Sequence, residues 1–344
     1  PQVPIRAAAC AALGCALGGS GGIQPPLQLD IMKTIKLTLG ERSSTAELRG
    51  SLLAVCPRLA AHAEGLWAGE LFDSLTALLT KHLDDPSPAA RAAAASALGE
   101  TLVAALGHPY KRSAKGSKSK KIFDSKKEKE PASAMEAVLA TLAAPAAAGR
   151  SGGVSRELRL SLSHATVAML RGMRRPELER HSLAVVAHLL ALLSGGAEAA
   201  TRERRSSSAA DAEKKEREHD MMCHSIAHAL RAGLGELLSE HSQAAMAASL
   251  ALAATGRAAS ETVIVVCLRE ISMLLISVRE RGGSARDSLL QGERPLLSLI
   301  EHPSRPVRLA ACLCLWSVSL AFPAQLSGLL NTTINRVRSR SRPA

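Results

Sequence analysis

Aromatic side chains are scarce in this sequence, and their scarcity excludes several fold classes. Only 2% of the 344 residues are aromatic, although 47% are hydrophobic. Alanine and leucine supply most of the apolar mass, and both are strong helix formers. The β-branched residues that strands favour are concentrated in short runs such as 262–266. The composition therefore argues against all-β and doubly wound α/β folds and predicts an all-α protein.

Paired cysteines at metal-site or redox-site spacing are absent. The seven cysteines are odd in number, include no Cys-x-x-Cys pair and lie mostly in apolar helical context, as at 311–315. Buried, reduced thiols of intracellular proteins have this distribution. The sequence also lacks a charged segment followed by an apolar core and a cleavage site. We therefore expect an intracellular protein with reduced thiols.

The chain also lacks a catalytic signature. The glycine-rich segment 18–22 has neither a preceding strand nor the pattern of a phosphate-binding loop. Cys223, His224 and His228 lie close in sequence, but the glutamate of a His-Glu-x-x-His motif and a second ligand pair are missing. No nucleophile elbow accompanies the scattered serines and histidines. We predict no enzymatic activity, no cofactor and no metal.

Positive charge is concentrated in two short segments. The formal net charge is +12, of which residues 109–131 contribute +6 and residues 332–344 contribute +4. The rest of the chain is nearly neutral, so the basic balance belongs to a loop and a tail and says little about the folded surface.

A repeated pattern organises the chain. Segments 86–98 and 303–315 match when they are aligned, because each has a proline, an arginine five residues later and a leucine seven residues after that. The matched residues are Pro86, Arg91 and Leu98 with Pro303, Arg308 and Leu315. Each segment follows an apolar helical stripe, so the pattern predicts a helix, a tight turn and a second helix.

The arginine recurs with a period of about 43 residues. Arg6, Arg49 and Arg91 lie 43 and 42 residues apart, and Arg159 fits once an insertion near 108–132 is removed. This period is that of HEAT or armadillo arrays. We predict an α-solenoid of about seven HEAT-type helix-pair repeats, which stack because one pair cannot bury its apolar face alone. An Ala-rich four-helix bundle is the alternative, but it does not predict the spacing.

The turn between the paired helices has its own chemistry. We expect Ser87 to cap the second helix and Pro88 to occupy its first position, where no N–H is needed. Asp84 or Asp85 lies close enough to pair with an arginine of the same or an adjacent repeat, although a solvated helix start is the alternative for these arginines. Leu98 and its counterpart are expected to fill the space between layers.

The pattern divides the chain into six parts. They are HEAT repeats at 1–108, a basic disordered insertion at 109–131, a HEAT repeat at 132–195, a charged Ser-rich disordered insertion at 196–217, HEAT repeats at 218–331 and a basic tail at 332–344. Neither insertion can bury enough apolar area to offset the entropy of ordering. Because the first residues already fit the middle of a repeat, we expect a fragment of a longer, N-terminally truncated array.

The two insertions carry candidate regulatory or binding residues. The candidate contacts with an anionic partner are Lys111, Arg112, Lys115, Lys118, Lys120 and Lys121, and the candidate phosphorylation sites are Ser206, Ser207 and Ser208. The lysine-rich run is alternatively a solvated loop, a contact with an anionic membrane or a nuclear-import or nucleic-acid element. Nucleic acid is disfavoured because only Tyr110 and Phe123 flank the run for base stacking.

Two stretches resemble the HEAT repeat-containing protein 5 family. The first is 153–159, which contains Arg156-Glu157-Leu158-Arg159. The second is 302–326, with its His-Pro-Ser turn, Ala/Cys/Leu helix and Pro-Ala-Gln-Leu exit. The likeness extends loosely over 85–335, and the charged insertions depart from it. These are scaffold positions, so the resemblance carries over no catalytic or binding residue.

The resemblance implies a protein of membrane traffic. It implies a cytoplasmic location, peripheral to the trans-Golgi network, endosomes and clathrin-coated vesicles. The implied partners are the clathrin-adaptor complex and its accessory factors. We therefore predict a non-enzymatic scaffold for protein–protein interactions in endosome-to-Golgi transport and protein localisation. The alternative is a nuclear HEAT-repeat protein that binds nucleic acid or a transport receptor through 111–129.

Overall fold

The computed structural model describes residues 2–19, 21–41, 44–68, 70–110, 133–148, 155–203, 209–235, 238–256, 259–281 and 293–340. Within these ranges the secondary structure is helical, and the β pairing consists of one isolated bridge between Ile23 and Ala63. The predicted all-α fold is confirmed. The chain divides into two compact units, Pro1–Met173 and Arg174–Ala344.

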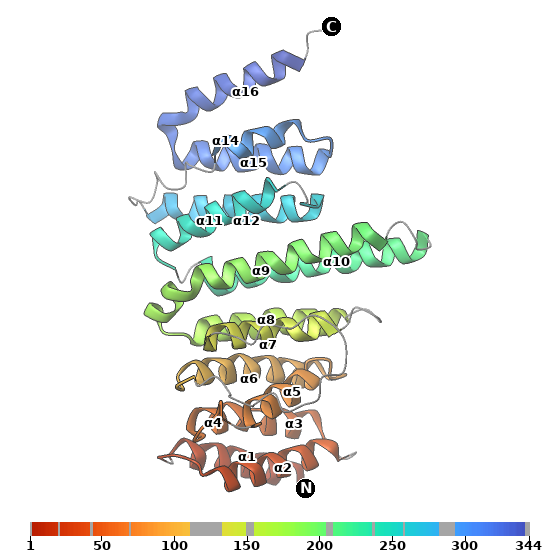
Figure 1. Ribbon diagram of the computed structural model, residues 1–344, viewed down its shortest axis with the longest axis vertical. Helices are drawn as coiled ribbons and strands as arrows, with labels where there is room; N and C mark the ends of the chain where they lie inside the picture. The colour runs from red at the N-terminus through yellow and green to blue at the C-terminus, as the bar shows by residue number, and fades with distance from the viewer. Residues whose placement is uncertain are drawn as a thin grey trace, which may run out of the picture. The chain divides into compact units, whose positions relative to one another are not determined.

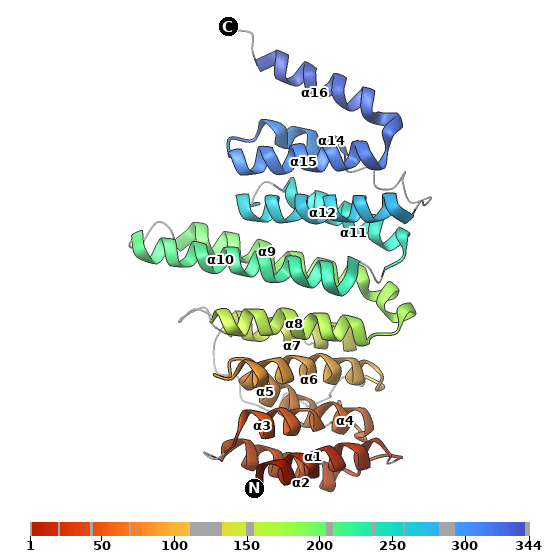
Figure 2. The same cartoon turned by 180° about the vertical axis from the view of Figure 1, so that it is seen from behind.

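The first unit is a stack of helix pairs. Its helices are α1 (Gln2–Gly18), α2 (Pro25–Gly40), α3 (Ala46–Leu53), α4 (Val55–His62), α5 (Leu71–His82), α6 (Pro88–Leu106), α7 (Ala134–Ala148) and α8 (Arg156–Gly172). We call the first helix of each pair the A helix and the second the B helix. Helix α1 packs on α3 and α4, which together form one B helix; these pack on α6, and α6 packs on α8 (Figures 1 and 2). The B helices therefore form a continuous row.

The second unit repeats this arrangement. Its helices are α9 (Arg175–Glu203), α10 (Ala209–Leu230), α11 (Glu240–Ala254), α12 (Glu261–Arg281), α14 (Glu293–Ser298), α15 (Arg305–Ala321) and α16 (Leu326–Arg340). The B helices α10, α12 and α15 pack in that order, and the A helices α9, α11 and α14 form the other layer. Six helix pairs thus repeat across the described ranges, which confirms the α-solenoid.

Hydroxyl side chains cap three B helices of the first unit, and the sequence predicts the one at Ser87. Ser87 accepts a hydrogen bond from the Ala90 N–H, and Pro88 occupies the first turn of α6. Thr45 caps α3 and Ser155 caps α8 in the same way. Each such cap stabilises its helix by about 1 kcal/mol.

Small residues let neighbouring B helices approach closely. A Cβ atom added at Gly99 of α6 would lie 2.6 Å from the Ala165 carbonyl oxygen and 2.7 Å from the Met169 nitrogen of α8. Leu98 is fully buried and Leu315 is 8% exposed, so both fill the core as predicted.

The prediction that 196–217 is disordered is wrong for most of that segment. Helix α9 continues to Glu203, and α10 begins at Ala209. Alanine, glutamate, lysine and arginine are good helix formers, so a polar sequence of this composition extends a helix that is already nucleated. Glu213 and Arg217, one turn apart on α10, form an ion pair that supports it. Likewise, the segment predicted as a tail is helical as far as Arg340.

One described helix, α6, is long and apolar enough to cross a membrane, and half of it is buried inside the protein. The core helix of a helix stack has the same length and composition, and α6 packs on both of its neighbours in the B row. We therefore assign α6 to the core of the first unit.

The close approach at Gly99 gives a test of the packing. Replacing Gly99 by alanine should lower the free energy of unfolding of the first unit by about 1–3 kcal/mol, because two of the three nearest atoms belong to the backbone and the third is the Ala168 Cβ atom, so none can rotate away. Chemical denaturation followed by circular dichroism measures the change.

Gly14 of α1 is the matched control. A Cβ atom there meets no atom within 4 Å, so Gly14→Ala should be neutral or stabilising by up to about 1 kcal/mol. Equal destabilisation by the two substitutions would contradict the close helix contact.

Candidate functional site

Three of the predicted repeat arginines donate hydrogen bonds to the turns that precede the B helices. Arg49, Arg91 and Arg308 each donate a hydrogen bond from Nη1 to the carbonyl oxygen five residues earlier, at 2.6, 3.2 and 2.6 Å. Arg91 and Arg308 also donate to the carbonyl oxygen six residues earlier, at 2.7 and 2.9 Å. The two segments aligned by sequence therefore have the same turn geometry, which supports the register assigned to the repeat.

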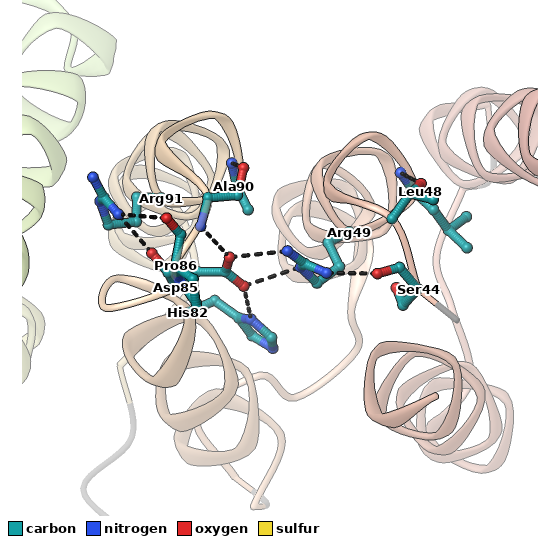
Figure 3. Close-up of polar contacts among 10 residues, drawn as sticks. Ser44, Leu48, Arg49, His82, Asp85, Pro86, Ala90 and Arg91 are labelled. Atoms are coloured by element: carbon teal, nitrogen blue, oxygen red, sulfur yellow. Dashed lines mark hydrogen bonds and ion pairs between the residues drawn. The ribbon is translucent and has the colours of Figure 1, made fainter. Parts of the chain in front are cut away.

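Asp85 connects two neighbouring repeats. Its carboxylate forms an ion pair with Arg49, 36 residues earlier, at 3.0 Å, and it accepts a hydrogen bond from the Ser87 N–H at 2.9 Å (Figure 3). Nδ1 of His82 lies 3.4 Å from the same carboxylate. The predicted pairing of an acid in this turn with an arginine of an adjacent repeat is confirmed for Asp85.

The environment of Asp85 favours its charged form. Burial acts to raise the pKa of this carboxyl, but the hydrogen bonds from Ser87, Arg49 and His82 outweigh burial and hold the pKa below its ordinary value. Because the carboxylate is buried and multiply bonded, removing one of its partners should cost more stability than breaking an exposed ion pair.

The remaining repeat arginines differ in their surroundings. Arg6 of α1 pairs with Glu41 at 2.8 Å, but both side chains are more than a third exposed, so the pair contributes under about 1 kcal/mol. Arg159 of α8 is buried. The feature that recurs among the repeats of this chain is therefore the position of the arginine at the start of a B helix. The partner of the arginine changes from repeat to repeat.

Sequence reasoning missed a second set of contacts between repeats, made by hydroxyl groups. Ser155 donates to Asp84 at 2.5 Å and Ser304 to Glu261 at 2.7 Å, while Thr262 donates to Asp220 at 2.7 Å. The last two pairs span 43 and 42 residues, which is the predicted period. For Ser155 and Ser304 the available signal is a Ser or Thr four residues before the repeat arginine, a position that Thr45 and Ser87 also occupy.

The B helices of the second unit form a groove of about 830 Å³. Its lining includes three large apolar side chains that are unusually exposed, namely Met273 at 46%, Leu309 at 55% and Leu313 at 60%. Cationic and imidazole side chains accompany them, namely Arg231, Arg269, His224 and His228.

Helical spacing explains why these side chains converge. Leu309 and Leu313 lie four residues apart on α15, as do Arg269 and Met273 on α12. Residues one turn apart share a helix face, so each B helix presents one short row to the groove. His224 and His228 form the corresponding row on α10.

One buried carboxylate, that of Glu270, lies in the lining of this groove. Glu270 is 3% exposed and accepts two hydrogen bonds from the Arg231 guanidinium, one of them at 3.2 Å. Burial raises the pKa of Glu270 above its ordinary value, against the lowering effect of Arg231. The pair therefore fixes the Arg231 side chain at the groove.

The cysteines are not paired with one another. All seven are free thiols, and Cys15 and Cys312 are exposed whereas the other five are buried as expected. Burial raises the pKa of Cys56, Cys223 and Cys267 to about 12, so these thiols are poor nucleophiles. Within the described ranges, no group of three or more His, Cys, Asp or Glu side chains is placed to hold a metal ion.

The candidate residues of the two insertions lie outside the described residues. These are Lys111, Arg112, Lys115, Lys118, Lys120 and Lys121, with Ser206, Ser207 and Ser208. Their roles as anionic-partner contacts and phosphorylation sites stay predictions.

No known protein-family model matches the chain. Among solved structures, it is similar to a designed armadillo repeat protein, with 15% sequence identity over 84% of this chain and 99% of that chain. The TM-score of this superposition is 0.29, so the fold assignment rests on the helix pairs and their packing.

The Asp85 network predicts a pH-dependent stability. Asp85→Asn should lower the free energy of unfolding of the first unit by about 2 kcal/mol at pH 7, because it leaves Arg49 without its charged partner. A carboxyl whose folded pKa is lowered stabilises above the unfolded pKa, which is about 4, and loses that effect as pH falls through the folded pKa. Urea denaturation from pH 7 to pH 2 measures the difference.

The neighbouring Asp84 is the control, because it is exposed and makes the single bond to Ser155 described above. Asp84→Asn should cost less than about 1 kcal/mol. A difference between wild type and Asp85→Asn that stays constant down to pH 2 would rule out the charge as its origin.

Breaking the ion pair between Arg231 and Glu270 should lower stability, and a second substitution should restore it. Arg231→Met should lower the free energy of unfolding by about 2 kcal/mol at pH 7, because it leaves a buried carboxylate without its partner. The loss should shrink as pH falls, since a raised folded pKa lets Glu270 take up a proton before the unfolded chain does. The double variant Arg231→Met/Glu270→Met should recover most of it, and a double variant no more stable than the single one would contradict the pairing.

Proposed function

We propose that this chain is a non-enzymatic helical-repeat scaffold that binds other proteins through exposed surfaces of its B helices. The observation that carries the proposal is the groove across α10, α12 and α15, where exposed Leu309 and Leu313 lie beside cationic side chains. Clustered exposed apolar side chains with a polar rim are typical of protein-binding surfaces. Stacked helix pairs supply such a surface on rigid elements.

The finer proposal is a role in clathrin-adaptor-linked vesicle traffic between endosomes and the trans-Golgi network. Its support is the resemblance of 153–159 and 302–326 to the HEAT repeat-containing protein 5 family. In this finer form the protein is cytoplasmic and peripheral to those membranes, and its partners are the clathrin-adaptor complex and its accessory factors. Residues 302–326 include the turn before α15, α15 itself and the Pro323–Gln325 turn, and the described part of 153–159 lies at the start of α8, so the matched residues support kinship in the scaffold.

A purification from cells tests both levels of this proposal. The tagged full chain should enrich cytosolic proteins, with clathrin-adaptor subunits among them, and should give a punctate perinuclear and endosomal signal by microscopy. Enrichment of other cytosolic partners would keep the scaffold and reject the trafficking role. A nuclear signal with chromatin or RNA-binding proteins would reject the trafficking role in favour of the nuclear alternative.

Deletion of 111–129 separates these two readings further. The trafficking scaffold should keep its partners and its location without this segment, because its proposed surface lies in the second unit. A nuclear protein that works through the lysine-rich run should lose both.

A further inference from the structure

We infer that the groove over α10, α12 and α15 binds a short acidic segment of a partner protein that carries aliphatic or aromatic anchor residues. This inference rests on the proposed scaffold function and names the chemistry of the segment that the scaffold recognises. Two properties of the groove support it, its apolar rows and the sign of its charge.

The repeat framework does not require the apolar row on α15. In the alignment of 303–315 with 86–98, Leu309 and Leu313 take the positions of Ala92 and Ser96 on α6. Ala92 and Ser96 are also exposed, so these positions face solvent in both units and contribute little to the stack. Two exposed leucines at positions where alanine and serine suffice indicate contact with another molecule.

The charge of the lining selects the partner. Arg231 and Arg269 face the groove, and Glu270 is the only carboxylate among the described residues that line it. Glu270 is buried and bonded to Arg231, whereas Arg269 is exposed. The groove therefore presents net positive charge beside leucine and methionine, which complements an acidic segment with apolar anchors.

The groove between α2 and α5 differs from this one in its charge and in the exposure of its leucines. That groove, of about 670 Å³, is lined by Glu70 and Asp73 together with Lys36 and Lys81, so its charges balance. Its leucines, Leu39 and Leu78, are buried. It therefore lacks both properties on which the inference depends.

The size and composition of the α10, α12 and α15 groove favour a peptide over other anionic partners. A volume of about 830 Å³ is that of a pocket for a drug-sized ligand, so it accepts a few side chains and not a whole domain. Among the described residues that line the groove there is no phenylalanine, tyrosine or tryptophan, whose large rings are the usual platforms for stacked bases. A peptide anchored by a few apolar side chains and held by carboxylates satisfies both conditions.

Three fluorescein-labelled twelve-residue peptides test the inference. The first has two leucines four residues apart and four glutamates, the second has lysine in place of each glutamate, and the third has serine in place of both leucines. Fluorescence anisotropy with the full chain should show the first peptide binding at least about tenfold more tightly than either of the others. Equal binding of the three peptides, or no binding of the first, would overturn the inference.

Substitutions then locate the site. Arg269→Glu and Leu313→Ser should each weaken binding of the acidic peptide by about tenfold, and both residues are exposed, so the fold should persist by circular dichroism. The matched controls are Arg180→Glu on α9 and Leu252→Ser on α11, which are exposed and lie outside the groove lining. The controls should change binding by less than about twofold. Groove variants that bind as wild type would also overturn the inference.

A negative result of the peptide experiment can be told apart from failure of the proposed function. If the peptides do not bind but the full chain still enriches cytosolic partners from cells, the groove assignment is wrong and the scaffold stands. If the wild-type chain enriches no protein, the proposed function itself fails.

Discussion

A pair of helices cannot bury its apolar face without a neighbour, and the structure of this chain follows from that constraint. The B helices satisfy it by direct packing, which is so close between α6 and α8 that Gly99 leaves no room for a methyl group. Apolar packing alone does not fix the register of one pair on the next. Asp85 and Arg49, together with the hydroxyl-to-acid contacts one period apart, supply directional bonds at the turns.

The same constraint separates scaffold positions from functional ones. Residues that face a neighbouring pair are committed to packing, as fully buried Leu98 is. Residues on the outer face of a B helix are not, and α6 fills those positions with Ala92 and Ser96. In α15 the equivalent positions carry Leu309 and Leu313, beside the exposed Arg269 of α12. The groove is therefore a local change of side chains on a common backbone, which is how repeat proteins acquire binding surfaces.

The sequence predicted the helix pairs and the arginine positions because both follow from local periodicity. The spacing of Arg49 and Arg91, with a proline turn before the latter, was enough to assign the register and to name Asp84 or Asp85 as the acid at the turn, and the structure shows that Asp85 pairs with Arg49. The prediction was wrong at 196–217. Disorder was predicted there from the polar composition, although alanine, glutamate, lysine and arginine in this segment are good helix formers. Sequence reasoning also missed the groove, because that surface joins residues of three helices spread over 224–313, and only packing brings them together.

Hydrogen–deuterium exchange of the full chain with and without the acidic leucine peptide tests the central claim most directly. Binding at the groove should slow exchange in α10 and in the short helix Arg231–Gly235, and also in α12 and the first half of α15, while exchange in the first unit stays unchanged. Slower exchange confined to the first unit, or no change in either unit at saturating peptide, would contradict the assignment of the binding surface to these B helices.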